Sequence, residues 1–129
     1  MPATDLLDVP LTDLERRVLL GGIAEWGGPA NCTEEFAVAM GFRSVADLYE
    51  TSERPYKSLK GAQALTQVDW VRVLLMTEIV FVSNVVGSGW DWQSTVGVPD
   101  SETIALIQGI QLKIPLAGVV GIVFGTRSA

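Results

Sequence analysis

Apolar residues recur at helical spacing along most of the chain, and no segment keeps the two-residue alternation of a half-buried strand. The repeats predict helices over about 13–26, 34–40, 45–51, 67–86 and 101–114. One more turn is expected where Pro55 can open a helix, and it fades near Gly61. The sequence therefore predicts an all-α fold, a single compact bundle of five or six helices around one long buried helix over about 67–86.

Polar residues at the predicted helix starts, and glycine or proline at the ends, support these boundaries. Thr12 and Glu15 have the T-x-x-E spacing of a capping box, in which each side chain binds the other residue's backbone N–H. The other expected N-caps are Thr33, Ser44, Thr66 and Asp100. The expected stops are Gly27–Gly28–Pro29, Gly41, Gly87, Gly89 and Pro115.

Two adjacent glycines interrupt the first predicted helix. Gly21 and Gly22 lower its helix propensity, so their presence needs a reason outside the helix itself. We expect another helix to approach the chain closely at this point.

The predicted helices define one domain. Residues 11–114 hold all of them, and residues 1–10 precede them as an N-terminal extension. Residues 115–129 follow as an apolar C-terminal tail, either an extended strap over the bundle or a loosely held end.

The long helix has a polar and an apolar face when its residues are placed 100° apart. The stripe expected to face water holds Asp69, Arg72, Met76 and Ser83. The opposite, buried stripe holds Val71, Leu74, Leu75, Val82 and Val85. Glu78 falls in the middle of the apolar stripe, where an ionised carboxylate buried alone is very costly.

Glu78 therefore needs a cation, several hydrogen-bond donors or a proton. On the first helix Arg16 shares a side with Leu20 and Ile23, which makes it a better partner than Arg17. We expect a structural Arg16–Glu78 pair, buried or half-buried, that fixes how the two helices cross. The alternative is that Glu78 lines a pocket.

The net charge of −6 argues against a nucleic-acid binder, whose affinity comes largely from Lys and Arg on phosphates. It also disfavours binding to anionic lipid. The one long apolar run, 68–86, contains Asp69, Arg72 and Glu78, which makes a membrane span expensive. We therefore expect neither a nucleic acid nor a membrane as partner, and the lone Cys32 fits a reducing cytoplasm.

Catalytic and metal-binding motifs are not found in the sequence. It has no histidine, which removes Ser-His-Asp triads, Cys-His pairs and the usual His-containing zinc and di-iron sites. The GSGWDW run at 87–92 follows a helix instead of a strand and lacks a third glycine, so it does not match a dinucleotide-binding loop. We expect no enzyme activity, no catalytic residue, no cofactor and no metal site.

A compact, acidic helical protein without a visible catalyst resembles the immunity proteins of bacterial toxin systems, which plug a toxin's active site or block its surface. The runs LERRVLLGGIAEWGG (14–28) and TEIVFVSNVVGSGWDW (77–92) are also similar to small bacterial proteins of unassigned function. The resemblance implies a non-catalytic inhibitor that neutralises a basic protein partner. It contains no motif with a known role, so it assigns no site residue.

The residues themselves favour two places for a partner. Tryptophan is enriched at interface hot spots and a neighbouring carboxylate can meet a partner's Arg or Lys, which makes Trp90, Asp91 and Trp92 candidates. Glu34 and Glu35 are also candidates, although the dipole of the helix that they open explains them equally. The tryptophans have a structural alternative too, because both rings can enter the core while Asp91 faces water.

Two other functions stay open. A stripe of isoleucines on the last helix, together with the apolar tail, gives either a homodimer surface or part of the core: Ile104, Ile107, Ile110 and Ile114. The third option is a small-ligand pocket beneath the 87–92 loop, lined by Trp90 or Trp92, with Glu78 as its polar anchor.

Overall fold

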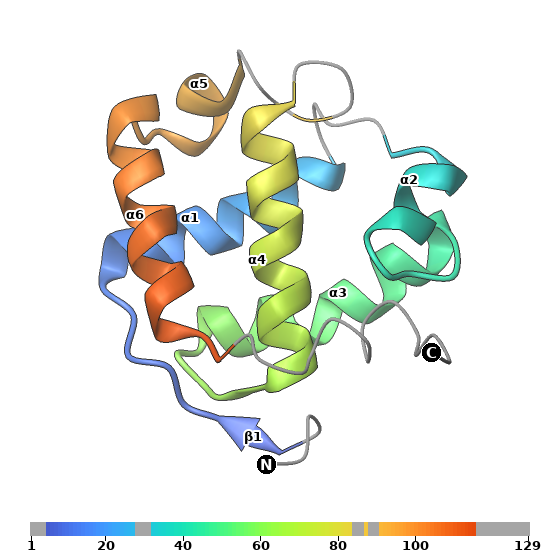
Figure 1. Cartoon of the computed structure of the whole chain (residues 1–129), viewed down its shortest axis with the longest axis horizontal. Helices are drawn as coiled ribbons and strands as arrows, with labels where there is room; N and C mark the ends of the chain where they lie inside the picture. Colours follow the sequence, from blue (N-terminus) through green and yellow to red (C-terminus); the bar gives the residue numbers. More distant parts are fainter. Residues whose placement is uncertain (1–4, 28–31, 84–86, 88–90, 116–129) are drawn as a thin grey trace, which may run out of the picture.

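The computed structural model describes residues 5–27, 32–83, 87 and 91–115, and these residues form a helical bundle with one short sheet (Figure 1). The helices are α1 (Asp13–Ala24), α2 (Glu34–Ala39), α3 (Val45–Lys60), α4 (Gln67–Val82), α5 (Trp92–Val96) and α6 (Asp100–Lys113), with a 3₁₀ turn η1 at Glu25–Gly27. The strands β1 (Leu6–Leu7) and β2 (Leu65–Thr66) pair antiparallel. The predicted all-α bundle of five or six helices is confirmed.

Helix α4 is the centre of the bundle and packs against α1, α3 and α6 (Figure 1). The predicted long buried helix is therefore confirmed, but the prediction of its faces is wrong. Asp69 is only 6% exposed and Met76 only 1%, whereas Val82 is 73% exposed. The reason is that neighbours cover most sides of α4, so the helix has no continuous stripe facing water.

The expected N-caps are formed at four of the five positions. Thr12 Oγ1 accepts from the backbone N–H of Glu15 at 3.1 Å, and the Glu15 carboxylate accepts from the N–H of Thr12 at 2.8 Å, which completes the capping box. The side chains of Thr33, Ser44 and Thr66 each accept from the backbone N–H three residues later. The fifth prediction is wrong, because Pro99 occupies the N-cap of α6 and Asp100 is its first helical residue.

Helix α3 is one continuous helix where the sequence predicted a helix and a separate turn. Pro55 lies inside it and leaves the backbone carbonyl of Thr51 without its helical donor. Leu48, Pro55 and Leu59 are nevertheless all buried, at the spacing of a single helix face. Burial of this face on both sides of the proline outweighs the lost hydrogen bond.

The end of α4 and the segment that follows it also differ from the prediction. Helix α4 ends at Val82, with Ser83 in an extended conformation, so it stops before Gly87. The segment after it contains the short helix α5, which the sequence pattern did not predict. Residues 84–86 and 88–90, and the predicted tail from residue 116 onward, lie outside the described residues.

The segment that precedes α1 is attached to the bundle through its backbone and its apolar side chains. The carbonyl of Leu7 accepts a hydrogen bond from the Trp70 indole on α4 at 2.9 Å. Val9 is 6% exposed and belongs to the core. These contacts, together with the β1–β2 pairing, hold residues 5–10 against the start of α4.

Gly21 and Gly22 mark the closest approaches to α1, as the sequence predicted. A Cβ placed on Gly22 would lie 1.9 Å from Thr77 Oγ1 and 2.8 Å from the Thr77 Cα atom on α4. A Cβ placed on Gly21 would lie 2.8 Å from a methyl group of Val96 on α5. The pair of glycines therefore lets two helices touch the α1 backbone at neighbouring positions.

Gly22→Ala is expected to lower the free energy of unfolding by about 1–3 kcal/mol, the usual effect of overpacking a core. The same change in an open helix stabilises it by about 1 kcal/mol, so the sign of the effect reports the contact with Thr77. Urea unfolding followed by circular dichroism measures the change. Gly61→Ala is the matched control, because a Cβ there meets its nearest atom at 3.6 Å. An unchanged unfolding midpoint for Gly22→Ala would contradict the close packing.

Candidate functional site

Trp92, the first residue of α5, packs between the C-terminal end of α4 and the N-terminal end of α6. It is fully buried, its ring makes an edge contact with Phe81 at 5.3 Å, and its indole N–H donates to Thr103 Oγ1 at 2.9 Å. Phe81 belongs to α4 and Thr103 to α6, so one side chain joins three helices. The structural interpretation of this tryptophan is therefore the one that the geometry supports.

Asp91 immediately precedes Trp92 and is exposed. It occupies the N-cap position of α5 without capping the helix through its side chain. Among the described residues it makes no ion pair, so its carboxylate is available at the surface. Trp90, the third residue of the predicted trio, lies outside the described residues.

Glu34 and Glu35 are exposed in the first turn of α2. The Glu34 carboxylate accepts from the backbone N–H of Val45 at 3.2 Å, which links α2 to the start of α3. Figure 1 places α2 on the opposite side of α4 from α6 and α5. The structure therefore does not bring these two glutamates together with Asp91 on one surface.

The expected pair between Arg16 and Glu78 is not formed between these described residues. Arg16 lies 4.0 Å from Asp13 on its own helix, and its buried Nε has no hydrogen-bond partner there. Glu78 is half-buried and accepts a hydrogen bond from the side-chain amide of Gln111 on α6. The physical reason is that α1 meets α4 through Gly22, one turn and a half beyond Arg16, while the Glu78 side of α4 meets α6.

The buried carboxylate of Glu15 is paired instead with the more exposed Lys113, and sequence reasoning missed this ion pair. Lys113 Nζ lies 2.6 Å from Glu15 Oε1, and the Glu15 side chain is only 6% exposed. Burial raises the pKa of the Glu15 carboxyl, but the hydrogen bonds from Lys113 and Thr12 outweigh burial, so this pKa lies below its ordinary value of 4.5. The pair joins the start of α1 to the end of α6.

Two further carboxylates are buried beside basic residues. Asp69 on α4 pairs with Arg54 on α3 at 2.9 Å. The Asp47 carboxylate accepts a hydrogen bond from the backbone N–H of Arg43, which is the main reason that the pKa of Asp47 is lowered. Burial opposes this lowering, and the Arg43 guanidinium adds to it. The Asp69–Arg54 pair therefore connects α3 to α4, and the Asp47–Arg43 contact connects α3 to the loop that precedes it.

The basic side chains of the described residues are all engaged within the chain. Five of them form ion pairs with acids: Arg16, Arg43, Arg54, Lys57 and Lys113. Three others contact a backbone carbonyl or an aromatic ring: Arg17, Lys60 and Arg72. By contrast, eight exposed acids make no ion pair with a described residue: Asp5, Asp8, Glu34, Glu35, Glu50, Asp91, Asp100 and Glu102.

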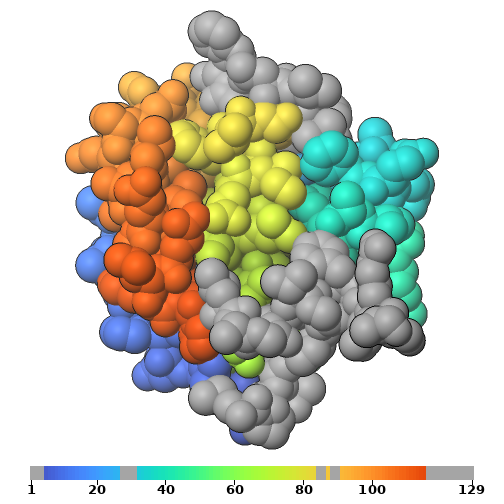
Figure 2. Space-filling model, viewed as in Figure 1, coloured from blue at the N-terminus to red at the C-terminus, as the bar shows by residue number. Residues whose placement is uncertain are grey.

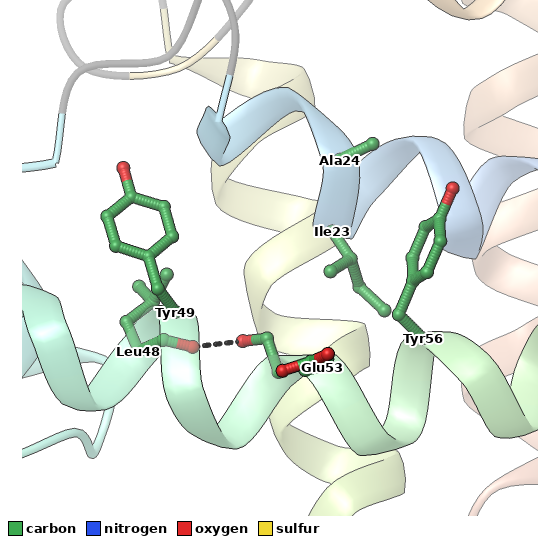
Figure 3. Close-up of a pocket in the computed structure, with 7 residues that line it drawn as sticks. Ile23, Ala24, Leu48, Tyr49, Glu53 and Tyr56 are labelled. Atoms are coloured by element: carbon green, nitrogen blue, oxygen red, sulfur yellow. Dashed lines mark hydrogen bonds between the residues drawn. The ribbon is translucent and has the colours of Figure 1, made fainter.

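A shallow apolar hollow of about 230 Å³ lies between α1 and α3 (Figure 3). Tyr49 and Tyr56 rise from α3 on either side of Ile23 (Figure 3). Most of its polar groups are used within the chain. Tyr49 donates to the carbonyl of Trp26, and Glu53 is paired with Lys57. The hollow offers apolar surface and little charge to a ligand.

A second hollow of about 260 Å³, the α4–α6 groove, lies between α4 and α6, which run side by side in Figure 2. Its lining residues are Glu78, Phe81, Val82, Ile104, Ile107, Gln108 and Gln111. The open alternative for Glu78, that it lines a pocket, is therefore what the structure supports. Three of the four isoleucines in the predicted stripe belong to the core: Ile107, Ile110 and Ile114. The fourth, Ile104, is 50% exposed.

Other chemistry is limited in the described part of the chain. No group of three or more His, Cys, Asp or Glu residues there is placed to hold a metal ion, and no described helix is long and apolar enough to cross a membrane. Burial, and next the Glu34 carboxylate, raise the pKa of the Cys32 thiol, which makes it a poor nucleophile at neutral pH.

Comparison of the chain with models of known protein families gave no match, and comparisons with curated proteins and with solved structures gave none either.

Trp92→Ala is expected to lower the free energy of unfolding by about 3–5 kcal/mol, because it removes a fully buried ring and leaves a cavity. Trp92→Phe should lose less, since it keeps most of the packing and gives up the hydrogen bond to Thr103. Asp91→Lys is the neighbouring control and should leave the melting temperature unchanged. Thermal unfolding of the three variants measures these effects, and equal losses at positions 91 and 92 would contradict the sealing role of Trp92.

The lowered pKa of Glu15 makes stability depend on pH. Its ionisation stabilises the folded state fully above the ordinary value of 4.5, and this contribution is lost as the pH falls below that value toward the lower folded-state pKa. Glu15→Gln should lower the free energy of unfolding by about 2 kcal/mol at neutral pH. As the pH falls below 4.5, the free energy of unfolding of this variant should decrease less than that of the parent. Denaturant titrations across this range test the prediction, with exposed Glu102→Gln as control. Parallel stability curves for Glu15→Gln and the parent would contradict it.

Proposed function

We propose that this protein is a non-catalytic binding module of the cytoplasm that neutralises a basic protein partner, in the manner of an immunity protein that blocks a toxin. The observation that carries the proposal is the distribution of charge. Every described basic side chain contacts a group of its own chain, whereas eight exposed acids make no ion pair with a described residue.

The eight acids thus present negative charge at the surface that is unpaired among the described residues. Five of the eight described basic groups, several of them also exposed, are paired with acids of their own chain. A field of one sign steers an oppositely charged partner and raises the association rate, and this effect weakens as salt is added. Inhibition by covering a surface needs no reacting group, which agrees with a sequence that has no histidine.

Self-association is supported less well than binding of a basic partner. The predicted dimer surface combined the isoleucine stripe with the apolar tail. Ile107, Ile110 and Ile114 of the stripe are used in the core, and the tail from residue 116 onward lies outside the described residues. An acidic surface also repels a second copy of itself.

The test is co-expression of this chain with the products of the genes that flank its own gene. We expect one basic product to arrest growth alone, to be tolerated when this chain is present, and to form a complex that weakens with salt. Asp91→Lys should weaken that complex by about tenfold, because it reverses a charge beside the buried Trp92. Glu50→Lys is the matched control on α3. Absence of any basic binding partner, or a complex insensitive to salt, would contradict the proposal.

A further inference from the structure

Unlike Glu53, which lines the hollow between α1 and α3 and pairs with Lys57, Glu78 has no ion-pair partner among the described residues. Its only described hydrogen-bond partner is the neutral amide of Gln111, and no described basic side chain lies within ion-pair distance of it. It is half-buried beside Phe81 and Ile107. A carboxylate in such surroundings gains from a cation that arrives with its own apolar body, because apolar walls strengthen the attraction.

The apolar residues next to Glu78 are open to solvent. Val82, one turn further along α4, is 73% exposed, and Ile104 across the groove is 50% exposed. Both belong to the α4–α6 groove. Exposed aliphatic side chains on facing helices form the kind of surface that an amphipathic helix covers in helix-in-groove recognition.

Acids stand at both ends of this apolar surface. Glu78 marks one end. At the other end, Asp100 lies one helical turn before Ile104 on the same side of α6. Asp91 is also near this end, because it adjoins Trp92, whose ring contacts the groove residue Phe81. From Asp100 to Gln111 α6 rises about 16 Å, which is the length of three helical turns.

We propose that the α4–α6 groove is the docking surface for the partner, and that its occupant is a basic amphipathic helix. The occupant places Lys or Arg at Glu78 and apolar side chains on Val82 and Ile104. This inference rests on the proposed function and specifies its interface. The hollow between α1 and α3 fits such an occupant less well, because Glu53 there is already paired with Lys57.

The direct test uses a labelled synthetic helix of about 18 residues, long enough to be helical, with leucines on one face and lysines on the other. Two comparison peptides have the lysines replaced by glutamate, or the same residues in an order without an apolar face. Fluorescence anisotropy with the full chain should show that only the first peptide binds. Equal binding of the reordered peptide would overturn the inference, because attraction to net charge alone then explains the result.

Variants of the chain locate the site. Glu78→Gln keeps the shape and a hydrogen-bonding group opposite Gln111, and it should weaken binding by about tenfold. Ile104→Ser, at an exposed position, should weaken binding similarly without lowering the melting temperature. Glu102→Gln is the matched control, since it removes the same charge from α6 at a residue outside the groove. Equal losses for Glu78→Gln and Glu102→Gln would overturn the inference.

Two further outcomes separate this inference from the proposed function. If a basic partner from the flanking genes binds, and Asp91→Lys weakens it while Glu78→Gln and Ile104→Ser do not, the groove is not the interface although the function stands. If n-butylamine alone protects the chain from unfolding through Glu78, the groove is a small-amine site and docking of a helix is wrong.

Discussion

The contact between α1 and α4 at Gly22 is the constraint on which the rest of the bundle depends. Because Gly22 has no Cβ, Thr77 of α4 lies directly against the α1 backbone. One turn later the Trp26 indole reaches a backbone carbonyl of α4 and is 1% exposed. The adjacent Gly21 admits Val96 of α5 in the same way. Two neighbouring glycines therefore position both the central helix and the short helix that follows it.

Helix α5 connects the glycine contacts of α1 to the α4–α6 groove. A helix of five residues has little stability of its own, so its position depends on its packing. Val96 is held against Gly21, and the backbone carbonyl of Val96 accepts a hydrogen bond from Arg17 at 3.1 Å. At the other end Trp92 is fixed between Phe81 and α6. The exposed Asp91 is thereby displayed from a rigid support, although its surroundings in sequence look like a loop.

The sequence predicts local features well because their causes lie within a few residues. The capping box of Thr12 and Glu15 is an example, since both partners are three residues apart. The faces of α4 could not be predicted in this way, because periodicity assumes that one side meets water. Asp69 is buried because Arg54 of another helix pairs with it. Pro55 likewise predicts the start of a separate turn until the burial of the helix face on both sides of it is known.

The same limit explains the ion pairs. Periodicity identified Glu78 as a carboxylate on an apolar face, but periodicity does not indicate which helix faces this residue. The structure shows that α6 faces Glu78 and that Gln111 of α6 is its hydrogen-bond partner. The cation of α6 is used by Glu15 instead. Among the described residues, Glu15 has a cation as its partner and Glu78 has an amide, which is a local conflict between charge and burial at Glu78. Such conflicts are expected where a surface is selected for binding, because the stability lost in the free protein is recovered when a partner supplies the charge.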